Sequence, residues 1–161
     1  MTYTYYLKIL NEKEKKEIEN QLNNQFGIKT ILGTITMKGS ERLFLFQGEL
    51  NNEEIKQFES IMPIERVGVY FAKLSDNAEG IRLTLEGSQI LGKQATKNIF
   101  ELNKEQVENW MKGQELDVKT EKEKTGFYLM KYKDSFLATG KVSENKIGNF
   151  VPKERRLKER G

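Results

Sequence analysis

Hydrophobic and polar positions in the last third of the chain follow a strand pattern. Residues 127–133 are rich in aromatic and β-favouring side chains, and residues 136–142 and 147–151 form two further segments of this kind. Short polar turns separate the three segments. Pro152 ends the third, because proline cannot donate a hydrogen bond to a strand ladder. The pattern predicts a β meander near the C-terminal end.

A helical period dominates the start of the chain, after a tyrosine-rich strand predicted over residues 2–10. Asn11 and Glu14 have the spacing of a capping box, so a helix is predicted to begin there. Gly27 supplies the stop signal. The buried face is expected to hold three apolar residues spaced four apart: Ile18, Leu22 and Phe26.

Two strands are predicted next, over residues 28–37 and 42–50. Residues 43–46 are apolar on both faces, which indicates a central strand. Asn51 or Asn52 is expected to cap a short helix that Pro63 closes.

The middle of the chain alternates short strands and helices. Strands are predicted over residues 67–72, 81–85 and 99–102, and one or two helical turns are expected to follow the second of them. Asn103 is predicted to cap a further helix, with Gln106 in the capping-box position. The elements together predict an α+β fold with two modules, over residues 1–62 and 63–161.

The composition narrows the chemistry that the chain can perform. The 161 residues include no cysteine and no histidine, which removes thiolate nucleophiles, disulfides, the usual general base and the commonest metal ligand. The three aspartates are far apart in sequence. We therefore expect no enzymatic activity, no cofactor and no metal, with a hydrolase that uses glutamate and lysine as the weakest alternative.

The net charge of +3 is concentrated at one end. Residues 141–161 hold seven basic and three acidic side chains, whereas the rest of the chain holds 20 basic and 21 acidic ones. This excess suits an acidic partner such as nucleic acid. No apolar run is long enough to span a bilayer and no secretory signal is present, so a cytoplasmic protein without a membrane partner is expected.

Three segments, residues 80–92, 105–113 and 126–157, resemble a known family in this order. They are similar to archaeal stand-alone proteins related to the C-terminal RNA-binding region of Sun-type RNA cytosine-5 methyltransferases. The resemblance implies a PUA-like mixed β-barrel over residues 63–161, preceded by a small pre-PUA-like α+β module over residues 1–62. The chain differs from the methyltransferases because it lacks their catalytic cysteine and a glycine-rich nucleotide-binding loop.

The basic tail is the first candidate site. Lys153, Arg155, Arg156 and Lys158 follow the last predicted strand directly. Arginine binds phosphate through planar, bidentate contacts, so these side chains are interpreted as a phosphate clamp. The alternative is a solvated tail that only ends the chain.

Further candidates lie on the predicted barrel. A basic face is expected from four lysines: Lys131, Lys133, Lys141 and Lys146. The alternative for these is edge-strand lysines that discourage aggregation. Gly87, Ser88 and Gln89 lie where a strand turns into a helix. A glycine there lets another backbone approach, and free helix N-terminal amides attract phosphate; the alternative is a tight strand-to-helix turn that needs glycine for its backbone angles. Arg82, on the strand before them, has two interpretations: a residue of the RNA-binding groove, or an ordinary surface charge.

These observations predict a non-catalytic protein that binds structured ribosomal or transfer RNA in ribosome biogenesis or RNA modification. The cationic side chains are expected to converge beside the groove of the barrel and to neutralise phosphates. The alternative is an adaptor that binds a ribosome-assembly factor or a separate RNA methyltransferase. An adaptor would expose an apolar patch larger than a few hundred Å².

Overall fold

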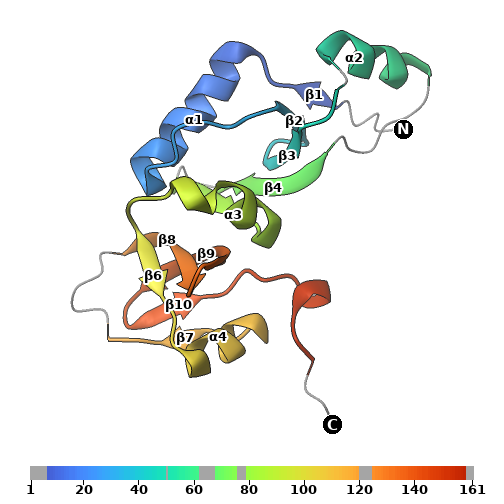
Figure 1. Ribbon diagram of the computed structural model, residues 1–161. Coiled ribbons are helices and arrows are strands. Elements are labelled where there is room, and N and C mark those ends of the chain that lie inside the picture. The colour runs from blue at the N-terminus through green and yellow to red at the C-terminus, as the bar shows by residue number, and fades with distance from the viewer. Residues whose placement is uncertain (1–6, 50, 62–67, 76–78, 120–124, 159–161) are drawn as a thin grey trace.

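The computed structural model describes residues 7–49, 51–61, 68–75, 79–119 and 125–158 (Figure 1). Within these residues the strands form two five-stranded sheets, with the orders β1-β2-β3-β4-β5 and β6-β8-β9-β10-β7. Figure 1 shows one sheet above the other, with α3 between them. The architecture confirms the predicted α+β class.

The first sheet is an antiparallel meander. Its strands are β1 (Lys8–Ile9), β2 (Thr34–Lys38), β3 (Arg42–Phe46), β4 (Val69–Leu74) and β5 (Ile81–Leu83). The apolar run predicted to be central does form β3, the middle strand, and its side chains Leu43, Phe44 and Leu45 are buried. A strand covered on both faces requires such a run.

Helix α1 (Glu12–Phe26) covers one face of this sheet and has the predicted ends. The Asn11 side chain accepts a hydrogen bond from the Glu14 backbone N–H at 2.8 Å, and the Glu14 carboxylate accepts one from the Asn11 N–H. Gly27 ends the helix in the left-handed conformation, with φ of 78°. The predicted face, Ile18, Leu22 and Phe26, is buried in the core.

Helix α2 (Asn52–Ile61) begins after Asn51, whose side-chain oxygen accepts a hydrogen bond from the Glu54 N–H at 2.9 Å. Of the two predicted caps, Asn51 and Asn52, Asn51 is therefore the one that caps the helix. Ile55 of this helix is buried. Pro63, the predicted end of this helix, lies outside the described residues.

The second sheet contains the predicted C-terminal meander. Its strands are β6 (Ile99–Glu101), β7 (Leu116–Asp117), β8 (Gly126–Tyr132), β9 (Ser135–Ser143) and β10 (Lys146–Gly148). β6 runs parallel to β8, and the other pairs are antiparallel. β7, with two residues, is too short to leave a periodic signal in the sequence.

Helix α4 (Lys104–Met111) closes one end of the second sheet (Figure 1). Asn103 and Gln106 form the predicted capping box. Trp110 is fully buried, and its indole N–H donates a hydrogen bond to the Leu137 carbonyl oxygen at 2.8 Å. The indole thereby anchors this helix to β9.

Helix α3 (Leu85–Leu91), continued by the short 3-10 helix η2 (Gly92–Gln94), packs against both β4 and β9. The main core reflects this arrangement, because Phe127, Leu129 and Phe136 of the second sheet join the cluster that contains α1 and the first sheet. The two sheets therefore share this cluster. A second cluster, which includes Trp110 and Met130, lies within the second sheet and the helices beside it.

The change between sheets falls after β5, between Leu83 and Ile99. The predicted boundary between residues 62 and 63 instead falls inside the first sheet. β4 and β5 lie C-terminal to that boundary in sequence, but they complete the first sheet by antiparallel hydrogen bonding to β3. Sequence position alone does not show which sheet a strand joins.

Several predicted strands are shorter than expected, including those over residues 42–50 and 81–85, which end at Phe46 and Leu83. The strand predicted over residues 28–37 begins only at Thr34, because Ile28 and Ile31 reach the core from an irregular connection. The strand predicted over residues 147–151 ends at Gly148, although Val151 is buried. In the described part of the chain, no helix has the length and hydropathy of a membrane span.

Candidate nucleic-acid interface

Hydrogen bonds from one side chain and from the backbone hold the C-terminal segment against α4. Asn149 donates hydrogen bonds from its side-chain amide to the carbonyl oxygens of Trp110 and Gln114, each at 2.9 Å. The Leu157 N–H donates to the Met111 carbonyl oxygen at 2.8 Å. The predicted clamp is therefore displayed on a fixed segment, which includes the 3-10 helix η3 (Lys153–Arg155).

The four predicted clamp residues have different environments. Arg155 forms an ion pair with Glu86 at the start of α3. The Arg156 Nε donates to the Val151 carbonyl oxygen at 2.9 Å, and its guanidinium lies against Gly113. Lys153 and Lys158 are exposed. Of the four clamp residues, only Lys153 and Lys158 have no side-chain ion pair or hydrogen bond within the described part of the chain.

The start of α3 does not offer the predicted free amides. The Gly87 N–H donates to the Thr84 hydroxyl at 3.0 Å, and the Ser88 N–H donates to the Thr84 carbonyl oxygen at 2.9 Å. Gly87 and Ser88 are buried between β4 and β9, so they position the helix and do not face solvent. Gln89 is exposed.

The meander lysines lie at two ends of the second sheet. Lys131 and Lys133 lie near the β8–β9 turn, whereas Lys141 and Lys146 lie near the β9–β10 turn. β9 has nine residues, so the two turns are roughly 25 Å apart. The four lysines therefore form two separate pairs and not one compact cluster, because an antiparallel meander places successive turns at opposite ends of its strands.

Neighbouring glutamates balance several of the predicted cations. Lys141 pairs with Glu79 at 2.9 Å, and the Lys131 ammonium lies 3.8 Å from Glu101. Lys133 has left the strand and occupies the turn, with φ of 53°. Residues two apart on a strand share a face, but Lys133 lies beyond the end of β8, so this rule does not align it with Lys131.

Arg82 contacts an aromatic pair of the C-terminal segment. Its guanidinium carbon lies 4.0 Å from the centroid of the Phe150 ring, and that ring makes a T-shaped contact with Phe127. Phe150 remains 41% exposed. A partly exposed aromatic ring beside a guanidinium is a surface on which a base can stack.

A hollow of about 340 Å³ lies between β4, the start of α3 and the tail. Tyr70, Thr84 and Arg155 line it, together with the carboxylates Glu86 and Glu154. Burial raises the pKa of Tyr70, and the nearby Arg42 and Arg82 cations oppose that shift only in part. The phenol is therefore neutral at physiological pH. Neutral polar groups and carboxylates are better suited to the edge of a base than to a phosphate.

Sequence reasoning did not single out Tyr70 or Thr84. Tyr70 belongs to β4 and Thr84 caps α3, and the Thr84 hydroxyl donates to the Tyr70 carbonyl oxygen at 2.8 Å. The signal that was available for Thr84 is its position as a cap before a short helix. Tyr70 carries no such local signal.

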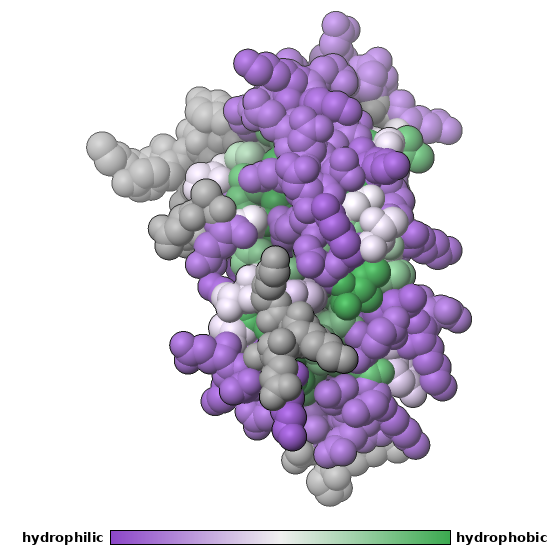
Figure 2. All heavy atoms as spheres, turned by 90° about the vertical axis from the view of Figure 1, so that its left-hand side faces the viewer, coloured by the Kyte–Doolittle hydropathy of each residue, from purple (hydrophilic) through white to green (hydrophobic). Residues whose placement is uncertain are grey.

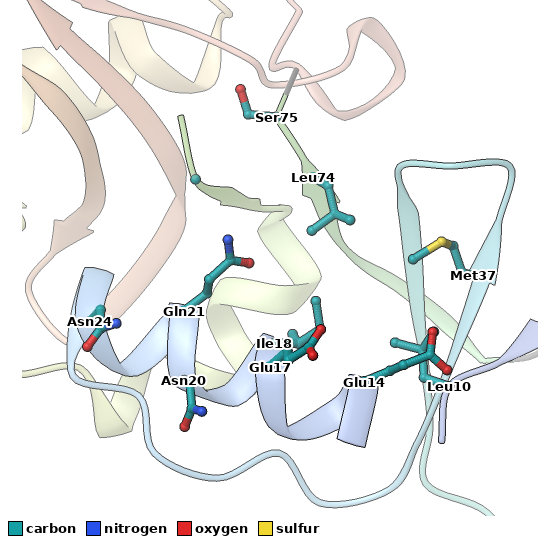
Figure 3. Close-up of a pocket in the computed structure, with 11 residues that line it drawn as sticks. Leu10, Glu14, Glu17, Ile18, Asn20, Gln21, Asn24, Met37, Leu74 and Ser75 are labelled. Carbon is teal, nitrogen blue, oxygen red and sulfur yellow. The ribbon is translucent and has the colours of Figure 1, made fainter. Parts of the chain in front are cut away.

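A second hollow, of about 530 Å³, lies beside α1 (Figure 3). Its floor is apolar, with Ile18, Met37 and Leu74, and its rim carries amides and the carboxylates of Glu14 and Glu17. No lysine or arginine is among its described lining residues, so it does not suit a phosphate.

The described geometry defines a mixed α+β protein whose second sheet, α4 and tail form one unit. Residues 97–157, the segment that runs from just before β6 to the tail, match the family described as the methyltransferase RsmF PUA domain. No curated protein matches the chain. The match confirms the predicted relation to the C-terminal region of Sun-type methyltransferases and the PUA-like character of this part of the chain.

The matched segment contains most of the predicted cations but not all of the predicted site. Arg82, Gly87, Ser88, Gln89 and Lys158 lie outside it. The segment at residues 80–92, which contributed to the predicted resemblance, also lies outside the match.

Proposed function

We propose that this protein binds structured ribosomal or transfer RNA without catalysing a reaction, and acts in ribosome biogenesis or RNA modification. The match of residues 97–157 to a PUA domain from a methyltransferase family carries this proposal. The chain has neither cysteine nor histidine, so the cysteine-based chemistry of the related methyltransferases has no counterpart in it.

The exposed tail lysines and the Phe150 surface support RNA over other partners. Lys153 and Lys158 offer phosphate contacts, and the exposed ring of Phe150 offers a stacking surface close to them in sequence. The hollow beside Tyr70 has neutral and carboxylate groups that suit an unpaired base. RNA-binding proteins read unpaired nucleotides in this way, with phosphates fixing the register.

The described residues give less support to the adaptor alternative. Figure 2 shows a mainly hydrophilic face on which small hydrophobic areas are separated by polar side chains. The exposed large hydrophobic residues among those described are spread over different elements: Leu32, Val69, Ile90, Phe150 and Leu157. A stable protein interface of ordinary size requires a more continuous apolar centre.

The first test is the binding of bulk transfer RNA and fragmented ribosomal RNA by the full chain, measured by filter binding at several salt concentrations. If about five phosphates are contacted, the log–log slope of affinity against salt is expected to be roughly −3.5 to −4.5. Wild-type protein that binds neither RNA would contradict the proposal.

Replacing Lys153 and Lys158 by glutamine then tests the tail. The expected result is weaker RNA binding and a slope less negative by roughly 1.4 to 1.8, because two phosphate contacts are lost. The matched control is Lys13→Gln with Lys16→Gln, which removes the same charge from the exposed surface of α1. Equal losses in both variants would show that only net charge matters.

A further inference from the structure

Four cations lie directly opposite one another across the first sheet. Lys38 of β2 pairs in register with Arg42 of β3, Arg42 pairs with Lys73 of β4, and Lys73 pairs with Arg82 of β5. We call these four residues the cationic row. Adjacent strands are about 4.8 Å apart, so the row extends for roughly 14 Å across four strands.

The cationic row faces away from the main core. The residues next to it along the strands, Met37, Leu43, Ala72 and Leu83, pack into or against that core. Successive side chains on a strand point to opposite faces, so the row lies on the other face of the sheet. All four side chains of the row are partly or fully exposed.

This arrangement is unfavourable for the isolated fold. Like charges placed directly opposite each other on neighbouring strands are destabilising. Among the described residues, the only ion pair of the row joins Lys73 to Glu41, at 3.4 Å. Four adjacent cations with one paired carboxylate leave a concentrated positive charge, which a polyanion would neutralise.

The cationic row also leads to the matched segment. Arg82, at its end, stacks on Phe150, and Phe150 lies within residues 97–157. Tyr70 lies close enough to Arg42 and Arg82 for their charges to act on its hydroxyl, and burial keeps that hydroxyl protonated by raising its pKa. The surface beside the row thus supplies a neutral hydrogen-bond donor and an exposed aromatic ring.

We propose that the cationic row binds consecutive backbone phosphates of the same RNA, so that the RNA surface extends from the PUA-like segment onto the first sheet. This inference rests on the proposed RNA binding. Arginine and lysine fix the RNA backbone without reading its sequence. A chain that crosses the row would then reach Phe150, where a base can stack.

The experiment compares two triple variants of the full chain, with bulk transfer RNA as the probe. Lys38→Gln, Arg42→Gln and Arg82→Gln neutralise the row while keeping the Lys73–Glu41 pair. The control, Lys13→Gln, Lys16→Gln and Lys56→Gln, removes the same charge from exposed positions on α1 and α2. The row variant is expected to bind roughly tenfold or more weakly, with a salt slope less negative by roughly 2 to 3, while the control changes little.

Thermal unfolding provides the second measurement. The row variant is expected to melt at the wild-type temperature or above it, because a like-charge repulsion has been removed. If the triple variant is less stable than wild type, the single variant Arg42→Gln replaces it in the binding experiment, because Arg42 is exposed. The slope of log affinity against log salt concentration is then expected to be less negative by roughly 0.7 to 0.9.

The outcomes separate this inference from the proposed function. If the wild-type protein and the row variant bind RNA equally well, the proposal that the cationic row binds phosphates is refuted, and the proposed RNA binding by the PUA-like segment is unaffected. Equal weakening by row and control variants also overturns it, because the effect is then one of net charge. Wild-type protein that binds no RNA overturns both proposals.

Discussion

At the residue scale, the role of Gly87 shows how a local motif is misread. The sequence indicates a glycine that lets another backbone approach at a strand-to-helix turn. The structure confirms a close approach, but the backbone is that of the protein itself. A Cβ built on Gly87 would overlap the carbonyl oxygen of Phe71 on β4. The glycine is required for packing, and its amide donates to Thr84.

Gly87→Ala is therefore expected to destabilise the protein by roughly 1–3 kcal/mol, because the added methyl group overpacks the contact with β4. In an ordinary exposed helix the same change gains up to about 1 kcal/mol, so the sign of the effect is diagnostic. Urea unfolding measures it. Gln89→Ala, at an exposed position of the same helix, is the control and should be close to neutral. A Gly87→Ala protein as stable as wild type would contradict this assignment.

At the element scale, a buried hydroxyl links α3 to β9. Ser88 accepts a hydrogen bond from the Ala138 N–H at 2.8 Å, and its oxygen lies 3.2 Å from the Phe136 carbonyl oxygen. Ala138 has φ of 69°, a left-handed conformation that costs a non-glycine residue free energy. The serine therefore holds an irregular part of β9 in place.

Ser88→Ala should cost about 1–3 kcal/mol of unfolding free energy, because the buried Ala138 N–H loses its acceptor. Ser60→Ala is a matched control: Ser60 is exposed on α2 and its hydroxyl bonds only locally to Gln57. Hydrogen exchange at Ala138 checks the mechanism, since the amide should exchange faster in the variant. Unchanged protection there would argue against this contact.

At the scale of the whole molecule, the shared core links the two sheets. Phe127, Leu129 and Phe136 pack in the same cluster as Phe26 and Phe71. A fragment of residues 97–161 would expose the three second-sheet side chains to water. Each buried side chain of this kind contributes about 1.5–3 kcal/mol, which is large relative to the stability of a small domain.

The full chain is thus predicted to unfold in one cooperative transition, and the fragment of residues 97–161 to lack one. Calorimetry of the full chain and circular dichroism of the fragment are the measurements. Two separate transitions in the full chain, or a fragment that melts cooperatively, would show that the sheets are independent.

The sequence predicted the local features well. The capping boxes at Asn11 and Asn103, the stop at Gly27 and the central position of β3 are confirmed. These features depend on neighbours a few residues apart, which the sequence displays directly. The position of the candidate cations was predicted less well, because a turn reverses the chain and a partner such as Glu79 or Glu86 comes from a distant segment.

The sequence by itself determined the helix ends, the C-terminal meander and the relation of residues 97–157 to a PUA domain, because each is encoded in contiguous residues. Only the tertiary structure decided which cations are neutralised and which are neighbours. Lys38, Arg42, Lys73 and Arg82 are spread over 45 residues of sequence, and strand register alone brings them into one row. The short turn at residues 39–41 sets the register of β2 against β3. The pairing of β3 with β4 instead joins segments that α2 separates along the chain, so no local pattern reveals it.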